Sequence, residues 1–282
     1  HALRRKVIDY IWNSTGTLPD TLPLTRDVYS GQGTFPADLD GVEPALVVRV
    51  EQLSAEVDFG FEHISYQLHP AKSLQPERLL IIHQGHQGGL TDGISEMANK
   101  ALAHGLIVLL AQMPGSSWNQ DNTFELPGSQ PVPRTITIDG IDQTYCSTFH
   151  KNMFTELEPE IGGEIFRFFL EPIVVGINHF VRSYPDHNDV SMIGLSGGGW
   201  TTALMAAIDT RIDLSIPVAG SYPLYLRGLY KSEGDAEQFW PALYEDRASW
   251  LDLYILGAHG PGRRQIQLNS QFDSCCFYGL GY

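Results

Sequence analysis

Apolar and polar residues alternate in two segments of the N-terminal third of the chain. The segments ALVVRVEQLSAEV (residues 45–57) and FEHISYQLHP (residues 61–70) carry apolar side chains at about every second position. A period of two is typical of half-buried antiparallel strands. We therefore predict two antiparallel strands at the edge of a mixed sheet.

After these segments the pattern changes to short, continuous apolar runs separated by helical stretches. The runs are RLLIIH (78–83), LIVLLAQM (106–113), VSMIGL (190–195) and LSIPVAG (214–220), with a further strand signal in RQIQLNSQFD (264–273). Continuous apolar runs are typical of strands buried on both faces, and the helices between them imply β-α-β units. The predicted fold class is α/β, with a mostly parallel central sheet, antiparallel N-terminal strands and helices on both faces.

The chain divides into a lead-in and one large domain. Residues 1–43 are rich in Pro, Thr, Asp and Gly after a short helical start, and we expect them to wrap around the domain formed by residues 44–282. Residues 114–159 form a long irregular stretch inside that domain. Its length exceeds the roughly 15 residues usual for a structureless loop, so we expect an insertion that acts as a lid or pocket wall.

Charge and composition exclude two classes of partner. The chain has 18 Lys and Arg residues against 33 Asp and Glu residues, a formal net charge of −15, which disfavours nucleic acid because phosphate binding needs clustered cations. No segment reaches the roughly 18 consecutive apolar residues of a membrane span. Cys146, Cys275 and Cys276 show no metal-binding spacing and leave the disulfide state open. Secreted, periplasmic and cytoplasmic locations are all compatible with the sequence, and the oligomeric state is unknown.

The stretch SMIGLSGGGW (191–200) places Ser196 among four glycines directly after an apolar run. Gly194, Ser196 and Gly198 match the pattern G-x-S-x-G, and a helical segment follows. This strand–turn–helix setting is that of a nucleophile elbow, where residues without Cβ let strand and helix cross closely. Ser196 is therefore the predicted nucleophile. A glycine-rich turn with an incidental serine is the alternative.

With these motifs the chain resembles the α/β-hydrolase superfamily, particularly its serine esterases and related acyl hydrolases. The resemblance covers residues 44–282 and rests on GLSGGGW, on HQGHQGG (83–89) after an earlier strand, and on an acid after a later strand. It implies an oxyanion hole made by the backbone N–H of Gly197 and that of His86 or Gln87. It also implies an acid partner, for which Asp273 is the candidate.

The histidine of the implied triad does not occur where the resemblance places it. The order in this superfamily is Ser, then Asp or Glu, then His, and the residues SCCFYGLGY after Asp273 contain no histidine. The last strand and helix of such a sheet are also not evident. We expect the catalytic histidine and these elements beyond residue 282.

The sequence thus predicts a serine-dependent hydrolase, foremost a carboxylic ester hydrolase that works through an acyl-enzyme on Ser196. Its substrate would be a small-molecule ester, and neither a metal nor an organic cofactor is expected. A serine peptidase of the same fold and a non-catalytic binding protein of that fold are the alternatives. The acyl and alcohol preferences cannot be read from these residues.

Overall fold

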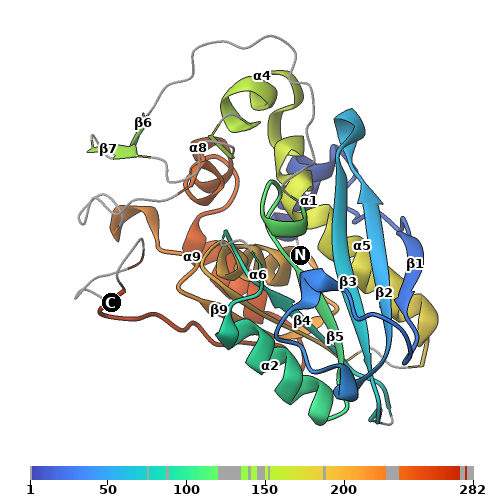
Figure 1. Ribbon diagram of the computed structural model, residues 1–282. Coiled ribbons are helices and arrows are strands. Elements are labelled where there is room, and N and C mark those ends of the chain that lie inside the picture. Colours follow the sequence, from blue (N-terminus) through green and yellow to red (C-terminus); the bar gives the residue numbers. More distant parts are fainter. Residues whose placement is uncertain are drawn as a thin grey trace.

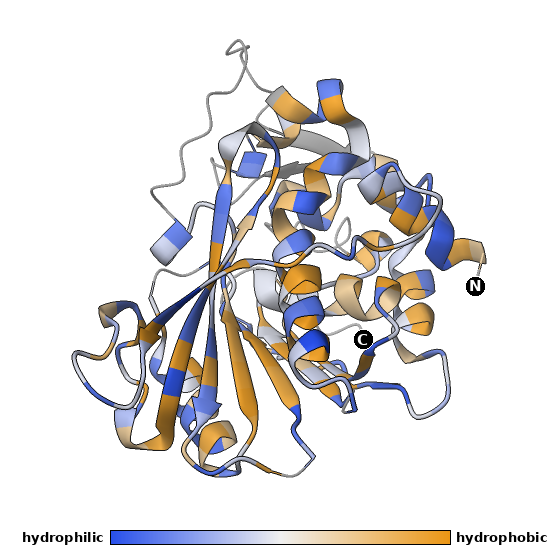
Figure 2. Ribbon diagram, turned by 90° about the vertical axis from the view of Figure 1, so that its right-hand side faces the viewer, coloured by the Kyte–Doolittle hydropathy of each residue, from blue (hydrophilic) through white to orange (hydrophobic). Residues whose placement is uncertain are grey.

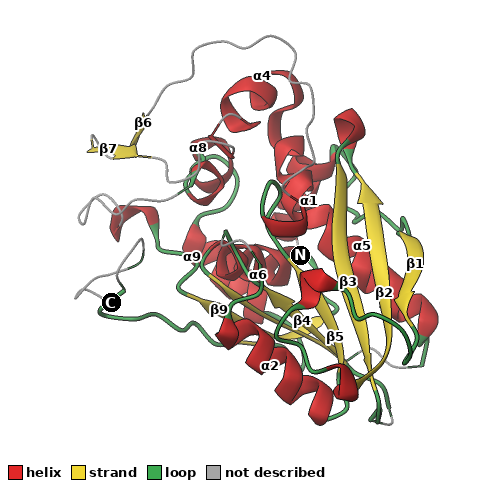
Figure 3. Cartoon of the chain, viewed as in Figure 1, coloured by secondary structure: helices red, strands yellow, loops and turns green. Residues whose placement is uncertain are grey.

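The described part of the chain forms one large mixed sheet with helices on both of its faces (Figures 1 and 3). The computed structural model describes residues 2–74, 76–86, 89–119, 135–138, 141–144, 150–151, 153–186, 189–226, 235–273 and 277. The strands are β1 (Leu24–Tyr29), β2 (Val47–Glu56), β3 (Glu62–Pro70), β4 (Leu79–His83), β5 (Ile107–Ala111), β6 (Thr135–Ile138), β7 (Ile141–Thr144), β8 (Val190–Leu195), β9 (Ile212–Val218) and β10 (Arg264–Gln265). The α-helices are α1 (Ala2–Trp12), α2 (Asp92–Ala103), α4 (Glu158–Ile161), α5 (Arg167–Ser183), α6 (Gly197–Ile208), α8 (Pro241–Tyr244) and α9 (Trp250–Ala258).

The strand order of the large sheet is β1-β2-β3-β5-β4-β8-β9-β10. Strands β1, β2 and β3 form an antiparallel meander, and β3 pairs antiparallel with β5. From β5 onward every pairing is parallel. The carboxyl ends of β4 and β8 therefore meet at the same edge, in the middle of the sheet, where open α/β sheets bind ligands.

Successive residues of the central strands enter two separate cores. In β4, Ile81 packs with α1, α5, α6 and α9 on one face, whereas Ile82 packs with α2 on the other. This happens because side chains alternate between the faces of a strand. Both faces are covered, so the central strands are mostly apolar. Figure 2 shows hydrophobic residues running along neighbouring strands. The predicted α/β class with antiparallel N-terminal strands is confirmed.

Three segments differ in detail from the sequence-based expectation. The lead-in, residues 1–43, contributes α1 to a core and β1 to the sheet edge. Within the insertion of residues 114–159, the structure describes a small two-stranded sheet, β6–β7, and helical turns. The strand expected at 264–273 is short, although its backbone pairing to β9 continues to Leu268. The division at residue 43 and the role of the insertion stay predictions.

None of the helices in the described ranges combines the length and apolar character needed to cross a lipid bilayer.

The turn between β8 and α6 depends on close backbone contacts that only glycine permits. A Cβ on Gly198 would lie 2.2 Å from the carbonyl oxygen of His83 at the end of β4, and a Cβ on Gly194 would lie 2.2 Å from the carbonyl oxygen of Gly198. Both distances are far below van der Waals contact. These glycines therefore allow α6 to start directly above the carboxyl ends of β4 and β8.

We expect Gly198→Ala to destabilise the protein by at least about 2 kcal/mol, because the added methyl group overlaps backbone atoms that cannot move independently. Urea unfolding followed by circular dichroism measures the effect. The matched control is Gly93→Ala in the first turn of α2, where a Cβ meets no atom within 4 Å. The control should leave stability unchanged or raise it by up to about 1 kcal/mol, because alanine favours a helix more than glycine does. Equal stability of the two variants would contradict the inference that a side chain at Gly198 overlaps the backbone.

A buried histidine on β3 makes stability depend on pH. The side chain of His63 is 1% exposed, and its Nε2 donates to the carbonyl oxygen of Gln112 at 2.9 Å. Burial lowers the pKa of His63 to about 4, although the hydrogen bond to Gln112 opposes this shift. His63 is therefore neutral in the folded protein near pH 7. In the unfolded chain its pKa returns to about 6.5.

The free energy of unfolding should fall as the pH drops from about 6.5 to about 4, because only the unfolded state binds a proton at His63 over that range. Above pH 6.5 His63 is neutral in both the folded and the unfolded state, so it adds no pH dependence to the free energy of unfolding. We expect His63→Gln to reduce the slope by up to about 1.4 kcal/mol per pH unit, measured by urea unfolding at several pH values. His104→Gln, at the exposed end of α2, is the control and should keep the wild-type slope. An unchanged slope in His63→Gln would refute the assignment.

Candidate active site

Ser196 occupies the turn between β8 and α6 in a strained backbone conformation. Its φ is 57° and its ψ is −120°, a region that costs a non-glycine residue about 1–3 kcal/mol and persists only where the surroundings enforce it. The Ser196 N–H donates to the carbonyl oxygen of Val218 at 2.8 Å, and the Ser196 carbonyl accepts from the N–H of Trp200 at 2.9 Å. The neighbouring strand β9 and the following helix α6 thus hold Ser196 from both sides.

The first turn of α6 supplies backbone donors beside the serine. Gly197 is the first residue of α6, and N–H groups at a helix start have no partner within the helix. The helix dipole adds partial positive charge at the same end. The position of Gly197 is therefore compatible with its predicted role as an oxyanion donor.

The loop after β4 packs directly against this turn. A Cβ on Gly197 would lie 2.4 Å from Cε1 and 2.5 Å from Nδ1 of His86, so the imidazole ring of His86 covers the α-carbon of Gly197. The sequence predicted a backbone role for His86; the structure adds a side-chain contact with the residue after Ser196. Gln87, the other predicted donor, lies outside the described residues.

Two buried side chains hold this loop in place. Nδ1 of His83 accepts a hydrogen bond from the N–H of Gly85 at 3.3 Å. Burial, with the nearby His63 and His86, lowers the pKa of His83 to about 3, so its ring is neutral. Oε1 of Gln84 accepts from the N–H of Thr91, at the start of α2, at 3.2 Å. The loop is therefore anchored at both of its ends.

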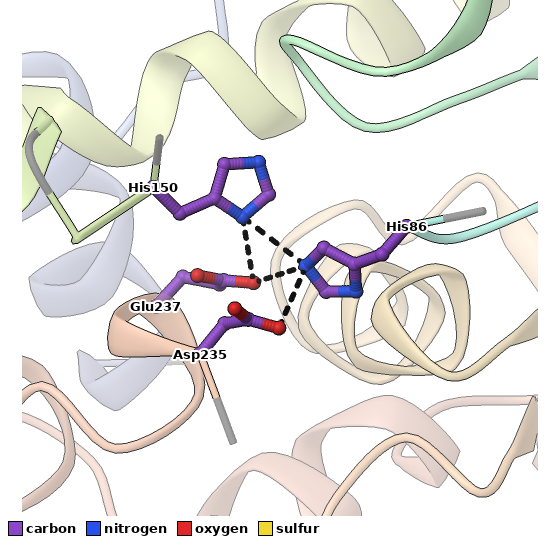
Figure 4. Close-up of side chains that lie close together, drawn as sticks. All are labelled: His86, His150, Asp235 and Glu237. Atoms are coloured by element: carbon purple, nitrogen blue, oxygen red, sulfur yellow. Dashed lines mark hydrogen bonds and ion pairs between the residues drawn. The ribbon is translucent and has the colours of Figure 1, made fainter. Parts of the chain in front are cut away.

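His86 also belongs to a buried cluster of four ionisable side chains (Figure 4). Its Nε2 lies 3.0 Å from Oδ2 of Asp235 and 3.0 Å from Oε1 of Glu237. Nδ1 of His150 lies 3.1 Å from the same His86 nitrogen and 3.3 Å from Oε1 of Glu237. Three separate segments of the chain therefore converge beside the turn that carries Ser196.

The charges within this cluster reinforce one another. Burial opposes ionisation of Glu237, but the charge of His150 and hydrogen bonds from both histidines hold the pKa of the Glu237 carboxyl well below its usual range. Burial likewise opposes protonation of His150, but Glu237 and Asp235 outweigh it and raise the pKa of the imidazole. Without another cation, His150 is an imidazolium at neutral pH and Glu237 is a carboxylate.

Asp273, the predicted acid, lies in a turn that follows β10. Its N–H donates to the carbonyl oxygen of Ser270 at 3.2 Å, and its Oδ1 accepts from the N–H of Phe277 at 3.5 Å. These contacts belong to its own turn and do not include Ser196. The structure therefore brings Ser196, Gly197 and His86 together, while the catalytic role of Asp273 stays a prediction.

Sequence reasoning did not bring His150, Asp235 and Glu237 together with His86. His150 lies 64 residues after His86 (150 − 86), and Glu237 lies 151 residues after it. No local motif joins residues so far apart, and only the pair Asp235 and Glu237, spaced two apart, gives a weak signal in the sequence.

Comparison with solved structures identifies the architecture. The methylesterase BT1017 superimposes with a TM-score of 0.56 at 16% identity, over 94% of this chain and 49% of that one. Acetyl xylan esterase 1 from Thermoanaerobacterium sp. JW/SL YS485 gives 0.52 at 13% identity, over 95% and 76%. The acetyl xylan esterase from Paenibacillus sp. R4 gives 0.50 at 10% identity, over 88% and 73%.

The chain spans about half the length of the methylesterase and about three quarters of the two acetyl xylan esterases. No protein-family model and no curated protein sequence matches it. Identities of 10–16% establish the fold and not the activity. Together with the sheet order and the strained serine after β8, these structures show that the chain has the α/β-hydrolase fold.

Proposed function

We propose that this chain is the catalytic part of a serine-dependent carboxylic ester hydrolase with Ser196 as nucleophile. The observation that carries the proposal is the backbone of Ser196, held at φ 57° between the carboxyl end of a central parallel strand and the start of a helix. Strain of this kind clusters at active sites, and this turn is the nucleophile elbow of α/β-hydrolases.

The proposed reaction uses Ser196 and backbone groups of the two segments assigned to the oxyanion hole. Ser196 Oγ attacks the ester carbonyl carbon, the alcohol leaves, and water then releases the acid from the acyl-enzyme. The N–H of Gly197 and the backbone N–H of His86 or Gln87 stabilise the oxyanion. Donors of this type contribute about 3–4 kcal/mol each to the transition state. The packing of His86 on Gly197 supports this assignment, because it brings the loop after β4 against the start of α6.

Asp273 is the proposed acid partner of a histidine that takes the proton from Ser196. The triad order places this histidine after the acid, and no histidine occurs between Asp273 and Tyr282. We therefore propose that the base is encoded after Tyr282. A serine without a base is a poor nucleophile, so the proposal is tested on the complete gene product rather than on residues 1–282 alone.

The structural neighbours suggest which esters to test first. Their names describe acetyl xylan esterases and a methylesterase, so acetyl esters and methyl esters are the first substrates to compare with longer acyl esters. A serine peptidase and a non-catalytic binding protein are the alternatives to this proposal.

In the complete protein, Ser196→Ala should abolish labelling by a fluorophosphonate probe and reduce ester hydrolysis by at least about 1000-fold, because the attacking oxygen is gone. Labelling is read by mass spectrometry and hydrolysis with p-nitrophenyl esters of graded acyl length. The matched control is Ser191→Ala, on the same strand five residues earlier, and it should retain both signals. A folded wild-type protein that stays unlabelled would favour the non-catalytic alternative. Hydrolysis retained by Ser196→Ala would rule out this serine.

A further inference from the structure

The four ionisable side chains beside the elbow direct four potential ligand atoms at one point. These atoms are Nε2 of His86, Nδ1 of His150, and one carboxylate oxygen each from Asp235 and Glu237, and all lie within 4.8 Å of one another. In Figure 4 the two rings and the two carboxylates face a common centre. They come from the loop after β4, from the segment before α4 and from the turn at residues 235–238.

The spacing of these atoms matches a tetrahedral metal ion. Nε2 of His86 lies 3.0 Å from an oxygen of each carboxylate and 3.1 Å from Nδ1 of His150, and Nδ1 of His150 lies 3.3 Å from Oε1 of Glu237. Zinc bonds to nitrogen and oxygen of about 2.0–2.1 Å keep tetrahedral ligands about 3.3–3.4 Å apart. Four of the six distances between ligand atoms therefore lie within about 0.4 Å of tetrahedral spacing, and the two that involve Asp235 with His150 and with Glu237 lie within 4.8 Å.

Burial and charge make a cation at this point favourable. The side chain of Glu237 is 0% exposed, that of His150 is 1% and that of Asp235 is 5%. Two carboxylates in a poorly hydrated place need positive charge beside them. Oε2 of Glu237 is also buried without a hydrogen-bond partner among the described residues, so the contacts of the cluster satisfy only one oxygen of this carboxylate.

Outer contacts hold the ligands in the orientation that metal binding requires. Nε2 of His150 donates to the carbonyl oxygen of Pro114 at 2.9 Å, which leaves Nδ1 directed at the cluster. Metal-binding histidines commonly make such a bond with their second nitrogen. The hydroxyl of Tyr244 donates to the carbonyl oxygen of Glu237 at 2.7 Å and accepts from Nε1 of Trp200 on α6 at 2.6 Å. The acidic turn is thereby fixed to the helix of the elbow.

We propose that His86, His150, Asp235 and Glu237 form a zinc-binding site that fastens the loop after β4 to the wall of the active site. Two imidazoles and two carboxylates suit zinc, whereas calcium and magnesium prefer all-oxygen ligands. Two carboxylates also balance the charge of a divalent ion. Four protein ligands leave no position for substrate, so the ion stabilises structure rather than reacting. No local motif in the sequence indicates this metal site, because the four ligands are far apart along the chain.

The experiment measures metal binding by the folded chain, without use of activity. Protein stripped with a chelator is titrated with Zn²⁺, and bound metal is counted by mass spectrometry after buffer exchange. We expect one zinc per chain and a rise in melting temperature that increases with free zinc, because a ligand that binds only the folded state stabilises it. Co²⁺ in place of zinc should give the visible absorption of a tetrahedral nitrogen–oxygen site.

Asp235→Asn is the informative variant, because it keeps the size of the side chain while removing one anionic ligand. We expect its zinc affinity to fall by more than about 100-fold, since even changes outside the first shell cost about 10–100-fold. His104→Ala removes an exposed histidine at the end of α2 and should bind like the wild type. Ser196→Ala should also bind one zinc, so the outcome is independent of the proposed hydrolase activity.

Two results would overturn the site. The first is a wild-type chain, folded by circular dichroism, that takes up no stoichiometric zinc. In that case the four side chains form a structural ion-pair cluster with His150 as its cation. The second is zinc uptake by Asp235→Asn with wild-type affinity and an unchanged Co²⁺ spectrum, which would locate the metal elsewhere. Should Asp235→Asn fail to fold, the wild-type titration and the Co²⁺ spectrum still decide the question.

Discussion

The structure depends on one close backbone crossing, where the start of α6 passes over the carboxyl ends of β4 and β8. A Cβ at Gly198 would lie 2.2 Å from the carbonyl oxygen of His83, so the helix can approach the sheet this closely only without a side chain there. The approach forces Ser196 into its positive φ. It also places the loop after β4 within reach of Gly197. The strained serine and the contact with His86 are therefore two consequences of the same crowding.

The crossing alone does not fix the loop that covers Gly197; buried polar contacts do. His83 and Gln84 hold the loop through hydrogen bonds to the backbone of Gly85 and Thr91. His86 holds it through contacts with the buried carboxylates of Asp235 and Glu237. Oxyanion donors work because they are positioned before the reaction starts and need no rearrangement during it. A loop fixed on both sides satisfies that requirement. The ion-paired cluster therefore contributes to the geometry of the proposed site.

The sequence predicted the fold well because the fold depends on local patterns. Apolar runs identified the strands that became β4, β5, β8 and β9, and alternation identified β2 and β3. The glycines around Ser196 predicted the tight turn between β8 and α6, because the need for residues without Cβ is also local. The edge strand β1 was missed because its six residues are mostly exposed and show no apolar period. The meeting of His150, Asp235 and Glu237 with His86 was not predicted, because it depends on tertiary packing over sequence separations of up to 151 residues.

The cluster also bears on how two acidic side chains can be buried in this part of the molecule. Asp235 and Glu237 are almost fully buried, and burial of two carboxylates is costly unless positive charge accompanies them. The imidazolium of His150 compensates one of these charges, and Oε2 of Glu237 has no hydrogen-bond partner among the described residues. A divalent ion compensates both and uses the neutral form of each histidine as a ligand. Charge balance, and not distance alone, thus favours a metal over a proton at the point where His86 and His150 meet.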